Sequence, residues 1–177
     1  VLVSCGQAVA SEWSQWRGTS RDGVADGSGL PAEWPESLRR AWGKRVGAGH
    51  SSPVVHSGRV YQMSREGDRE VVRGLDLATG RELWKVGYRA KYKVEPVARD
   101  HGAGPKSTPV LVGGRLVTFG ISGILSCWDT SSGRRVWSHE FSQRHRLTSP
   151  LYGHAASPIV VDGRVIVHVG GHDDGAL

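Results

Sequence analysis

Four histidines have side chains that could bind a ligand: His50, His101, His154 and His172. A neutral imidazole ligates metal ions and exchanges a proton near neutral pH. The first three precede short apolar runs, and His172 lies four residues after His168. If the fold gathers these positions, they form a histidine-lined rim that could bind a ligand. The simpler interpretation, which we favour, is that they are polar loop residues, and no metal site is predicted.

Two other features suggest chemistry only at first sight. The stretch HGAGPKST at 101–108 resembles a phosphate-binding loop, but Pro105 separates glycine from lysine, and a strand rather than a helix should follow. Cys127 occupies a small-residue position before an aspartate, which favours a buried, inert thiol over a nucleophile. Cys5 is the other cysteine, so the sequence predicts no disulfide framework.

The strongest pattern is a nine-residue motif that occurs twice, as DLATGRELW at 76–84 and DTSSGRRVW at 129–137. Both copies read Asp-x-x-x-Gly-Arg-x-x-Trp. The glycine permits a tight turn, and the aspartate can accept hydrogen bonds from turn amides. We therefore assign a structural rather than a catalytic role to the motif residues, which are Asp76, Gly80, Trp84, Asp129, Gly133 and Trp137.

The repeat extends upstream of each motif and has a third copy. Short apolar runs at 54–56, 110–112 and 159–161 each meet a turn containing glycine, and a second run rich in β-branched and aromatic residues follows, at 59–64, 115–120 and 164–169. This alternation predicts β-hairpins. The tryptophans of the two motifs lie 53 residues apart, a period typical of propeller blades.

A third strand ending at the motif aspartate and a fourth carrying the tryptophan complete each copy. Four antiparallel strands per repeat predict an all-β propeller, with blades at about 51–88, 105–141 and a truncated 157–177. No stretch keeps a helical period over three turns, which excludes helical repeats. The WD40 type is the alternative, because Trp128-Asp129 matches its dipeptide, but Leu75-Asp76 stands at the equivalent place.

Residues 11–45 are predicted to form an N-terminal segment in which Trp42 belongs to a closing strand, with the partial propeller at 46–177. Two and a half blades cannot close a ring of the usual four to eight. We therefore expect the sequence to be an incomplete fragment of a longer protein. Its expected partners include the remaining blades of the same propeller.

The first ten residues are predicted to be the end of an export signal, because Ala8-Val9-Ala10 is a small-x-small cleavage site before Ser11. A competing interpretation is a lipobox that would place a lipid anchor on Cys5, and a disordered cytoplasmic tail is the third. The first two predict a periplasmic or outer-membrane-associated protein. No apolar run is long enough to span a bilayer.

The charge does not indicate a nucleic-acid partner. The formal net charge is +6 and the isoelectric point is about 9.7, but the arginines are scattered singly, often beside turn glycines. A nucleic-acid groove needs clustered cations. A solvated basic surface is the better interpretation.

The motif pair resembles the quinoprotein-type β-propeller repeat. This repeat is found in quinone-dependent alcohol dehydrogenases and in the non-catalytic outer-membrane assembly lipoproteins of the BamB type. The start WSQWRGTSRDGVADGSGLPAEWP is similar to that of bacterial PQQ-binding-like propeller proteins, and the resemblance covers 13–177. It implies the fold more strongly than the function, because the repeat serves enzymes and scaffolds.

The resemblance therefore implies two functions of different classes. The favoured one is an exported, non-catalytic scaffold that binds a protein or small ligand and needs no cofactor. The alternative is part of a PQQ-dependent alcohol or sugar dehydrogenase. That resemblance would imply calcium ligands that include an asparagine, and in many members a pair of adjacent cysteines, whereas this sequence contains neither.

Overall fold

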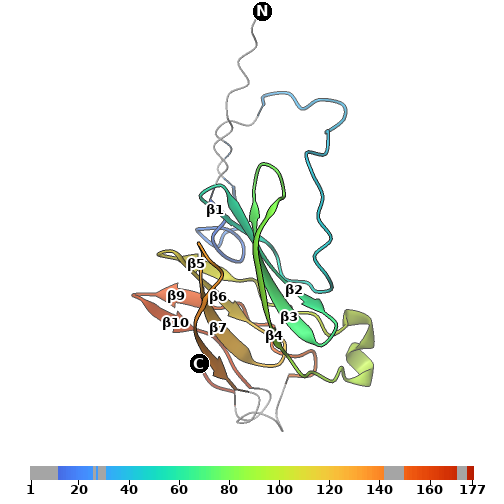
Figure 1. The fold of residues 1–177 in the computed structure, drawn as a ribbon, viewed down its shortest axis with the longest axis vertical. Helices are drawn as coiled ribbons and strands as arrows, with labels where there is room; N and C mark the ends of the chain where they lie inside the picture. Colours follow the sequence, from blue (N-terminus) through green and yellow to red (C-terminus); the bar gives the residue numbers. More distant parts are fainter. Residues whose placement is uncertain (1–11, 26, 28–30, 142–149, 171–174) are drawn as a thin grey trace, which may run out of the picture.

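A computed structural model describes residues 12–25, 27, 31–141, 150–170 and 175–177. Figure 1 shows an all-β arrangement of three neighbouring sheets. Two sheets have four strands in sequence order, and the third has two. Because every paired strand is antiparallel and each sheet follows its chain order, the sheets are the blades of a partial propeller.

Blade one contains β1 (Val54–His56), β2 (Arg59–Glu66), β3 (Arg69–Asp76) and β4 (Glu82–Arg89). The β2–β3 ladder runs without interruption from Arg59 opposite Asp76 to Glu66 opposite Arg69. The second strand is two residues longer than the sequence predicted. In the β3–β4 ladder, a register shift between Gly74 and Leu75 leaves Gly74 opposite Trp84. This pairing positions the Trp84 ring.

Blade two repeats this order with shorter strands: β5 (Val110–Val112), β6 (Arg115–Phe119), β7 (Ile124–Asp129) and β8 (Arg135–Glu140). Its register shift lies at the equivalent place, between Cys127 and Trp128. The shared shift shows that the two motifs build the same local geometry.

The third blade is represented by β9 (Ile159–Val161) and β10 (Arg164–Ile166). The second of these is shorter than the predicted run at 164–169, but Val169 and Ala176 exchange both backbone hydrogen bonds at 2.9 Å. A single 3₁₀ helix, η1 (Pro96–His101), lies between the first two blades. No described helix has the length and apolar character needed to cross a membrane.

The turns between the first two strands of the blades explain the glycines of the repeat. In Ser57-Gly58 and Asp162-Gly163, both residues have positive φ, at 48° and 71° and at 48° and 72°. This is the geometry of the two-residue hairpin turns whose twist matches that of the flanking strands. Gly113-Gly114 repeats this geometry at 52° and 73°, so the predicted hairpins are present in all three copies.

The first strands of the blades form the inner edge of the assembly, since β1 contacts β5 and β5 contacts β9. We call the end with the β1–β2 and β5–β6 turns the turn end, and the opposite end, where the chain passes between blades, the connection end. The N-terminal segment crosses the inner edge beside β1 and β5 (Figure 1). Trp13 exchanges two backbone hydrogen bonds of 2.9 Å with Val55, and Ser14 accepts one of 2.8 Å from Leu111.

Two apolar clusters hold neighbouring blades together. The first lies between blades one and two, and the second between blades two and three. In the first, Tyr88 stacks on Trp128 with ring centroids 6.0 Å apart. The Trp128 indole also donates a 2.9 Å hydrogen bond to Thr118 Oγ1, so this large buried ring is fixed at both its face and its polar atom.

Candidate functional site

The motif tryptophan of blade one lies against blade two. The indole Nε1 of Trp84 donates a 3.0 Å hydrogen bond to the carbonyl oxygen of Thr130. A Cβ atom at Gly133 would lie 2.7 Å from the Trp84 ring, and one at Gly74 only 2.5 Å from it. The ring is thus held between a glycine of its own blade and a glycine of the next.

Trp42 has the same relation to blade one. Its Nε1 donates a 2.8 Å hydrogen bond to the carbonyl of Leu77, and a Cβ atom at Gly80 would lie 2.6 Å from its ring. Leu77 and Thr130 each follow a motif aspartate, so the two acceptors are equivalent. Residues 35–47 form no strand, and Trp42 reaches the blade from an extended segment.

The motif aspartates close the turns beneath these tryptophans. Asp129 Oδ1 accepts hydrogen bonds from the backbone amides and hydroxyls of Ser131 and Ser132, at 2.5 to 3.1 Å. Asp76 accepts two from Thr79, at 2.6 and 2.9 Å. These donors hold the pKa of both carboxyls below its usual range, most strongly for Asp129. Both carboxylates are engaged in blade construction.

A buried carboxylate, Glu70, joins blade one to blade two. It is fully inaccessible to solvent. Its oxygens accept a hydrogen bond of 2.7 Å from the Tyr88 hydroxyl and another of 2.7 Å from the Ile121 amide. Burial raises the pKa of Glu70, and burial together with the nearby carboxylate raises that of Tyr88. A Cβ atom at Gly120 would lie 2.0 Å from Glu70 Oε2, so this glycine makes room for the carboxylate.

A buried guanidinium connects blade one to the N-terminal segment. Arg73 is 2% exposed and donates hydrogen bonds to the carbonyl of Val46 at 2.9 Å and to the Ser64 hydroxyl at 2.8 Å. It also pairs with Glu66 and, at 3.3 Å, with Glu82. Because a buried charge needs several partners, this network fixes the segment that follows Trp42 against the sheet.

Two of the predicted rim histidines come together at the connection end. His50 and His101 are exposed, with ring centroids 6.3 Å apart, and the His50 Nε2 lies 3.2 Å from the carbonyl of His101. The Tyr152 and His101 rings meet edge to face, with their centroids 5.1 Å apart. Lys106 Nζ donates to the same carbonyl at 3.4 Å. The structure therefore gathers two imidazoles, a phenol and an ammonium group.

His154 does not join this cluster. It is 3% exposed, packs edge-on against Phe119 at 5.2 Å and places Nδ1 3.3 Å from the Ile121 carbonyl. A Cβ atom at Gly123 would lie 2.9 Å from its ring. His154 thus fills the end of blade two because glycine leaves space there. His172 lies outside the described residues.

A cleft at the connection end adjoins the exposed histidines and consists of two pockets. The basic pocket, of about 320 Å³, is lined by Trp16, Arg21, Lys106, Ala155, Ala156 and Ser157. The apolar pocket, of about 670 Å³, is lined by Pro150, Leu151, Tyr152, Gly153, Ala155, Ala156, His168 and Gly170. Ala155 and Ala156 line both pockets, so the two pockets adjoin at these residues.

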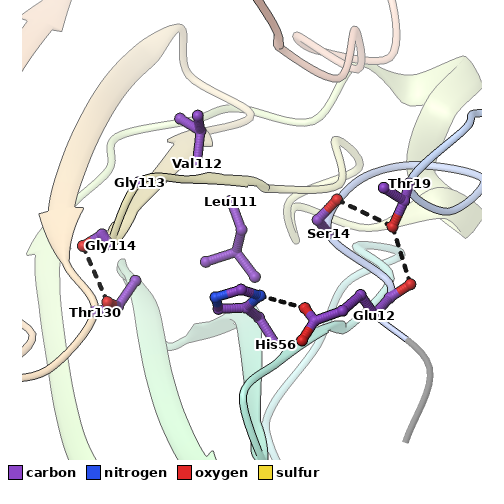
Figure 2. Close-up of a pocket in the computed structure, with 9 residues that line it drawn as sticks. All are labelled: Glu12, Ser14, Thr19, His56, Leu111, Val112, Gly113, Gly114 and Thr130. Atoms are coloured by element: carbon purple, nitrogen blue, oxygen red, sulfur yellow. Dashed lines mark hydrogen bonds and ion pairs between the residues drawn. The ribbon is translucent and has the colours of Figure 1, made fainter.

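A further pocket, of about 400 Å³, lies at the turn end (Figure 2). The N-terminal segment forms one wall, and the β5–β6 turn forms another. His56 Nδ1 pairs with Glu12, whose other oxygen accepts a 3.2 Å hydrogen bond from the Ser57 amide. Figure 2 shows the imidazole beneath Leu111. The pair closes the inner edge of blade one, and its residues are about half exposed.

The described residues do not fit a metal-dependent redox site. No three histidine, cysteine, aspartate or glutamate side chains among them converge as metal ligands. Cys127 is buried in the second cluster, and burial raises the pKa of its thiol. Calcium needs several oxygen ligands, whereas Glu70, Asp76 and Asp129 each use their oxygens within the blades.

Sequence reasoning missed the residues that join the blades by polar contacts, above all Glu70 and Arg73. Each stands next to a valine in β3. The order of apolar and polar residues in this strand does not indicate that a charged side chain is buried. The Trp16 and Arg21 pocket was also missed. Its signal was present in WSQWRGTSRDG, where aromatic and basic residues alternate with turn residues over a few positions.

Comparison with known proteins places this architecture among propellers. Residues 68–176 match the family model described as outer membrane protein assembly factor BamB. The quinohemoprotein alcohol dehydrogenase ADH-IIG of Pseudomonas putida is 28% identical over 71% of this chain and 16% of its own length. The quinoprotein alcohol dehydrogenase PedH of Pseudomonas putida is 25% identical over 80% of the chain and 23% of its own. The chain thus spans less than a quarter of either relative.

Two solved structures have the same fold. A europium-containing methanol dehydrogenase matches 75% of this chain and 23% of its own with a TM-score of 0.56 at 20% identity. BamB from Moraxella catarrhalis matches 72% of this chain and 33% of its own with a TM-score of 0.50 at 17% identity. At these identities the likeness is one of fold. It includes one protein named as a dehydrogenase and one named as BamB.

Proposed function

The chain belongs to the family of the outer membrane protein assembly factor BamB, and on this premise we propose that it is part of an exported, non-catalytic β-propeller. Its role is to bind a protein or a small ligand on loops that a rigid scaffold presents. The binding surface is the connection-end cleft with the exposed His50 and His101 beside it.

One observation carries this proposal: the carboxylates with perturbed pKa values in the blade interiors and motif turns are engaged in structural hydrogen bonds. Glu70 binds Tyr88 and the Ile121 amide, and Asp129 binds four donors of its own turn. A catalytic acid or base must instead reach a substrate proton. The exposed side chains at the connection end do not hold the blades together. They are therefore accessible to a ligand.

The alternative function is part of a quinone-dependent dehydrogenase, which the two Pseudomonas relatives favour. The residues of this chain contribute no group of converging metal ligands in the part that the structure describes. On this alternative, the blades here would serve as scaffold, and the reacting groups would lie in other parts of the protein.

Export forms part of the proposal. The Ala8-Val9-Ala10 sequence supports a mature chain that begins at Ser11, and the competing lipobox supports an acylated Cys5. Mass spectrometry of the native protein should find a peptide that begins at one of these two residues. Retention of residues 1–4 in the native protein would contradict both.

The decisive functional experiment uses the full-length protein. We expect no calcium-dependent stoichiometric binding of pyrroloquinoline quinone, and no dye-linked oxidation of alcohols or sugars. Absorbance titration and dye reduction provide the two readouts. Calcium-dependent stoichiometric quinone binding with turnover would establish the dehydrogenase instead.

A further inference from the structure

The connection-end cleft combines two cations with an apolar wall. Arg21 and Lys106 line its basic pocket, and neither lies within 4 Å of a carboxylate among the residues that the structure describes. The other described members of the pocket are a tryptophan, two alanines and a serine. A pocket with two cations and no acidic lining residue attracts an anion.

The loop that supplies Arg21 is built to hold its side chain there. Arg21 has a φ of 60°, in the left-handed region where glycine is favoured. Its amide donates a 3.1 Å hydrogen bond to Gly18, and Gly23 donates one of 2.9 Å to Arg17. The Arg21 guanidinium lies 6.0 Å from the centre of the Trp16 ring. This turn, closed by two backbone hydrogen bonds, fixes the backbone from which the Arg21 side chain reaches the pocket.

Lys106 enters the same pocket from the connection before blade two. Its ammonium group donates only long hydrogen bonds, of 3.4 and 3.3 Å, to the carbonyls of His101 and Gly102. Partial burial lowers the pKa of this amine. An anion beside it would compensate for the water that the ammonium group has lost.

The adjoining pocket is suited to an apolar group. Leu151 is 43% and Tyr152 41% exposed, and both line it. The Tyr152 ring is oriented by its perpendicular contact with the His101 ring. Because Ala155 and Ala156 line both pockets, a ligand with its charge against Arg21 could lay an apolar body along these alanines to Tyr152.

We propose that the connection-end cleft binds an organic carboxylate whose charged end lies between Arg21 and Lys106 and whose apolar body lies against Leu151 and Tyr152. The guanidinium supplies a fork of donors that matches a carboxylate, and the ammonium group supplies a second point charge. This inference rests on the proposed binding function and names the class of ligand at that site. Inorganic phosphate would leave the apolar pocket empty.

The carboxylate can come from two sources, a free apolar acid or the C-terminal residue of a peptide. Octanoate and a short peptide ending in leucine represent them. Their neutral counterparts, octanamide and the C-terminally amidated peptide, keep the apolar body and lose the charge. Whichever of octanoate and the peptide binds more tightly identifies the source. The difference in affinity between each acid and its amide tests the site itself.

The experiment is calorimetric titration of the full-length protein and three variants. Arg21→Gln and Lys106→Gln each remove one cation from the basic pocket. Arg134→Gln is the matched control, since Arg134 is exposed in the motif turn of blade two at the opposite end. We expect each pocket variant to weaken octanoate or peptide binding at least about tenfold, as loss of a charged hydrogen bond does. The control should bind as the unaltered protein does.

The comparison of acid with amide needs no variant, so it tests the site even if a substitution disturbs folding. Equal binding of acid and amide, no binding of either acid at millimolar concentration, or tighter binding of inorganic phosphate would overturn the inference. The quinone and dye-reduction experiment is separate. Absence of carboxylate binding without quinone turnover contradicts only this inference, whereas turnover contradicts the proposed function whatever the carboxylate result.

Discussion

Blade one and blade two have the same motif, register shift and turn chemistry, but their buried positions differ in character. Arg73 in blade one and Ser126 in blade two occupy equivalent places one residue before Gly74 and Cys127, and both are buried. Arg73 has four polar partners, including two carboxylates. The Ser126 hydroxyl has no hydrogen-bond partner in the described structure.

The two motif tryptophans differ in the same way. Trp84 is held by Gly74, Gly133 and the Thr130 carbonyl. Trp137 stands opposite Cys127 and packs on the second cluster. Within the described residues its indole N–H has no acceptor equivalent to the Thr130 carbonyl that binds Trp84. The repeat therefore builds each turn identically, while the contacts between blades are specific to each pair.

The largest expected effect comes from removing the tryptophan that joins the two blades. Trp84→Ala should destabilise the full-length protein by about 3 to 5 kcal/mol, because a large packed ring and its hydrogen bond are both lost. Denaturant unfolding measures the change. Trp34→Ala is the matched control, since Trp34 is 60% exposed and should have little effect. An unchanged unfolding midpoint for Trp84→Ala would show that the indole does not join the blades.

Glu70 tests whether the contact between blades one and two also depends on a buried polar group. Glu70→Ala should cost about 2 to 4 kcal/mol, because the Tyr88 hydroxyl and the Ile121 amide would both lose their acceptor inside the protein. Glu12→Ala is the control, as its carboxylate is about half exposed. Equal losses for the two variants would mean that Glu70 is hydrated and its burial unimportant.

The third comparison separates backbone strain from the contact with the indole. Gly133 has a φ of 73° and faces the Trp84 ring, whereas Gly163 has a φ of 72° and faces open space. Gly133→Ala should therefore cost about 1 to 3 kcal/mol more than Gly163→Ala, because a Cβ atom would overlap the ring. Thermal and denaturant unfolding of both variants give the difference. Equal losses of stability in the two variants would mean that Gly133 is required by the turn conformation alone.

The sequence predicted the blades because their signals are local. Turn glycines, alternating apolar residues and the Asp-x-x-x-Gly-x-x-x-Trp spacing each act within a few residues, and the first strand of every copy has the predicted bounds. The contacts of Glu70 with Ile121 and of Arg73 with Val46 join residues far apart in sequence. No local pattern contains that information.

The candidate site was less predictable for the same reason. His50, His101 and His154 occupy similar places in the sequence, but Gly123 opens a space that His154 fills, and its ring is buried. His101 ends the 3₁₀ helix before Gly102, and its ring remains exposed. Whether a loop histidine is accessible thus depends on which residue stands opposite it, and only the structure supplies that residue.

The smallest expected effects concern pH and have opposite signs at two carboxylates. Asp129 has a pKa lowered well below 3.8, so it contributes stability above that value and loses the contribution as the pH falls through its folded pKa. Glu70 has a pKa raised above 4.5, so the folded state binds its proton more tightly than the unfolded chain does. Its effect is to reduce stability as the pH rises from 4.5 through its folded pKa.

Substitution of each carboxyl by its amide separates the two effects. Asp129→Asn should flatten the loss of stability below pH 3.8, and Asp76→Asn should do so less, because Asp76 accepts fewer hydrogen bonds. Glu70→Gln should instead flatten the decline that begins above pH 4.5. The free energy of unfolding of the full-length protein, measured against pH for all three variants, gives the slopes. If Glu70→Gln instead changed the pH dependence of stability below pH 4.5, the two hydrogen bonds of Glu70 would be shown to stabilise its carboxyl in the charged form. The contact between blades would then be strengthened by ionisation rather than opposed by it.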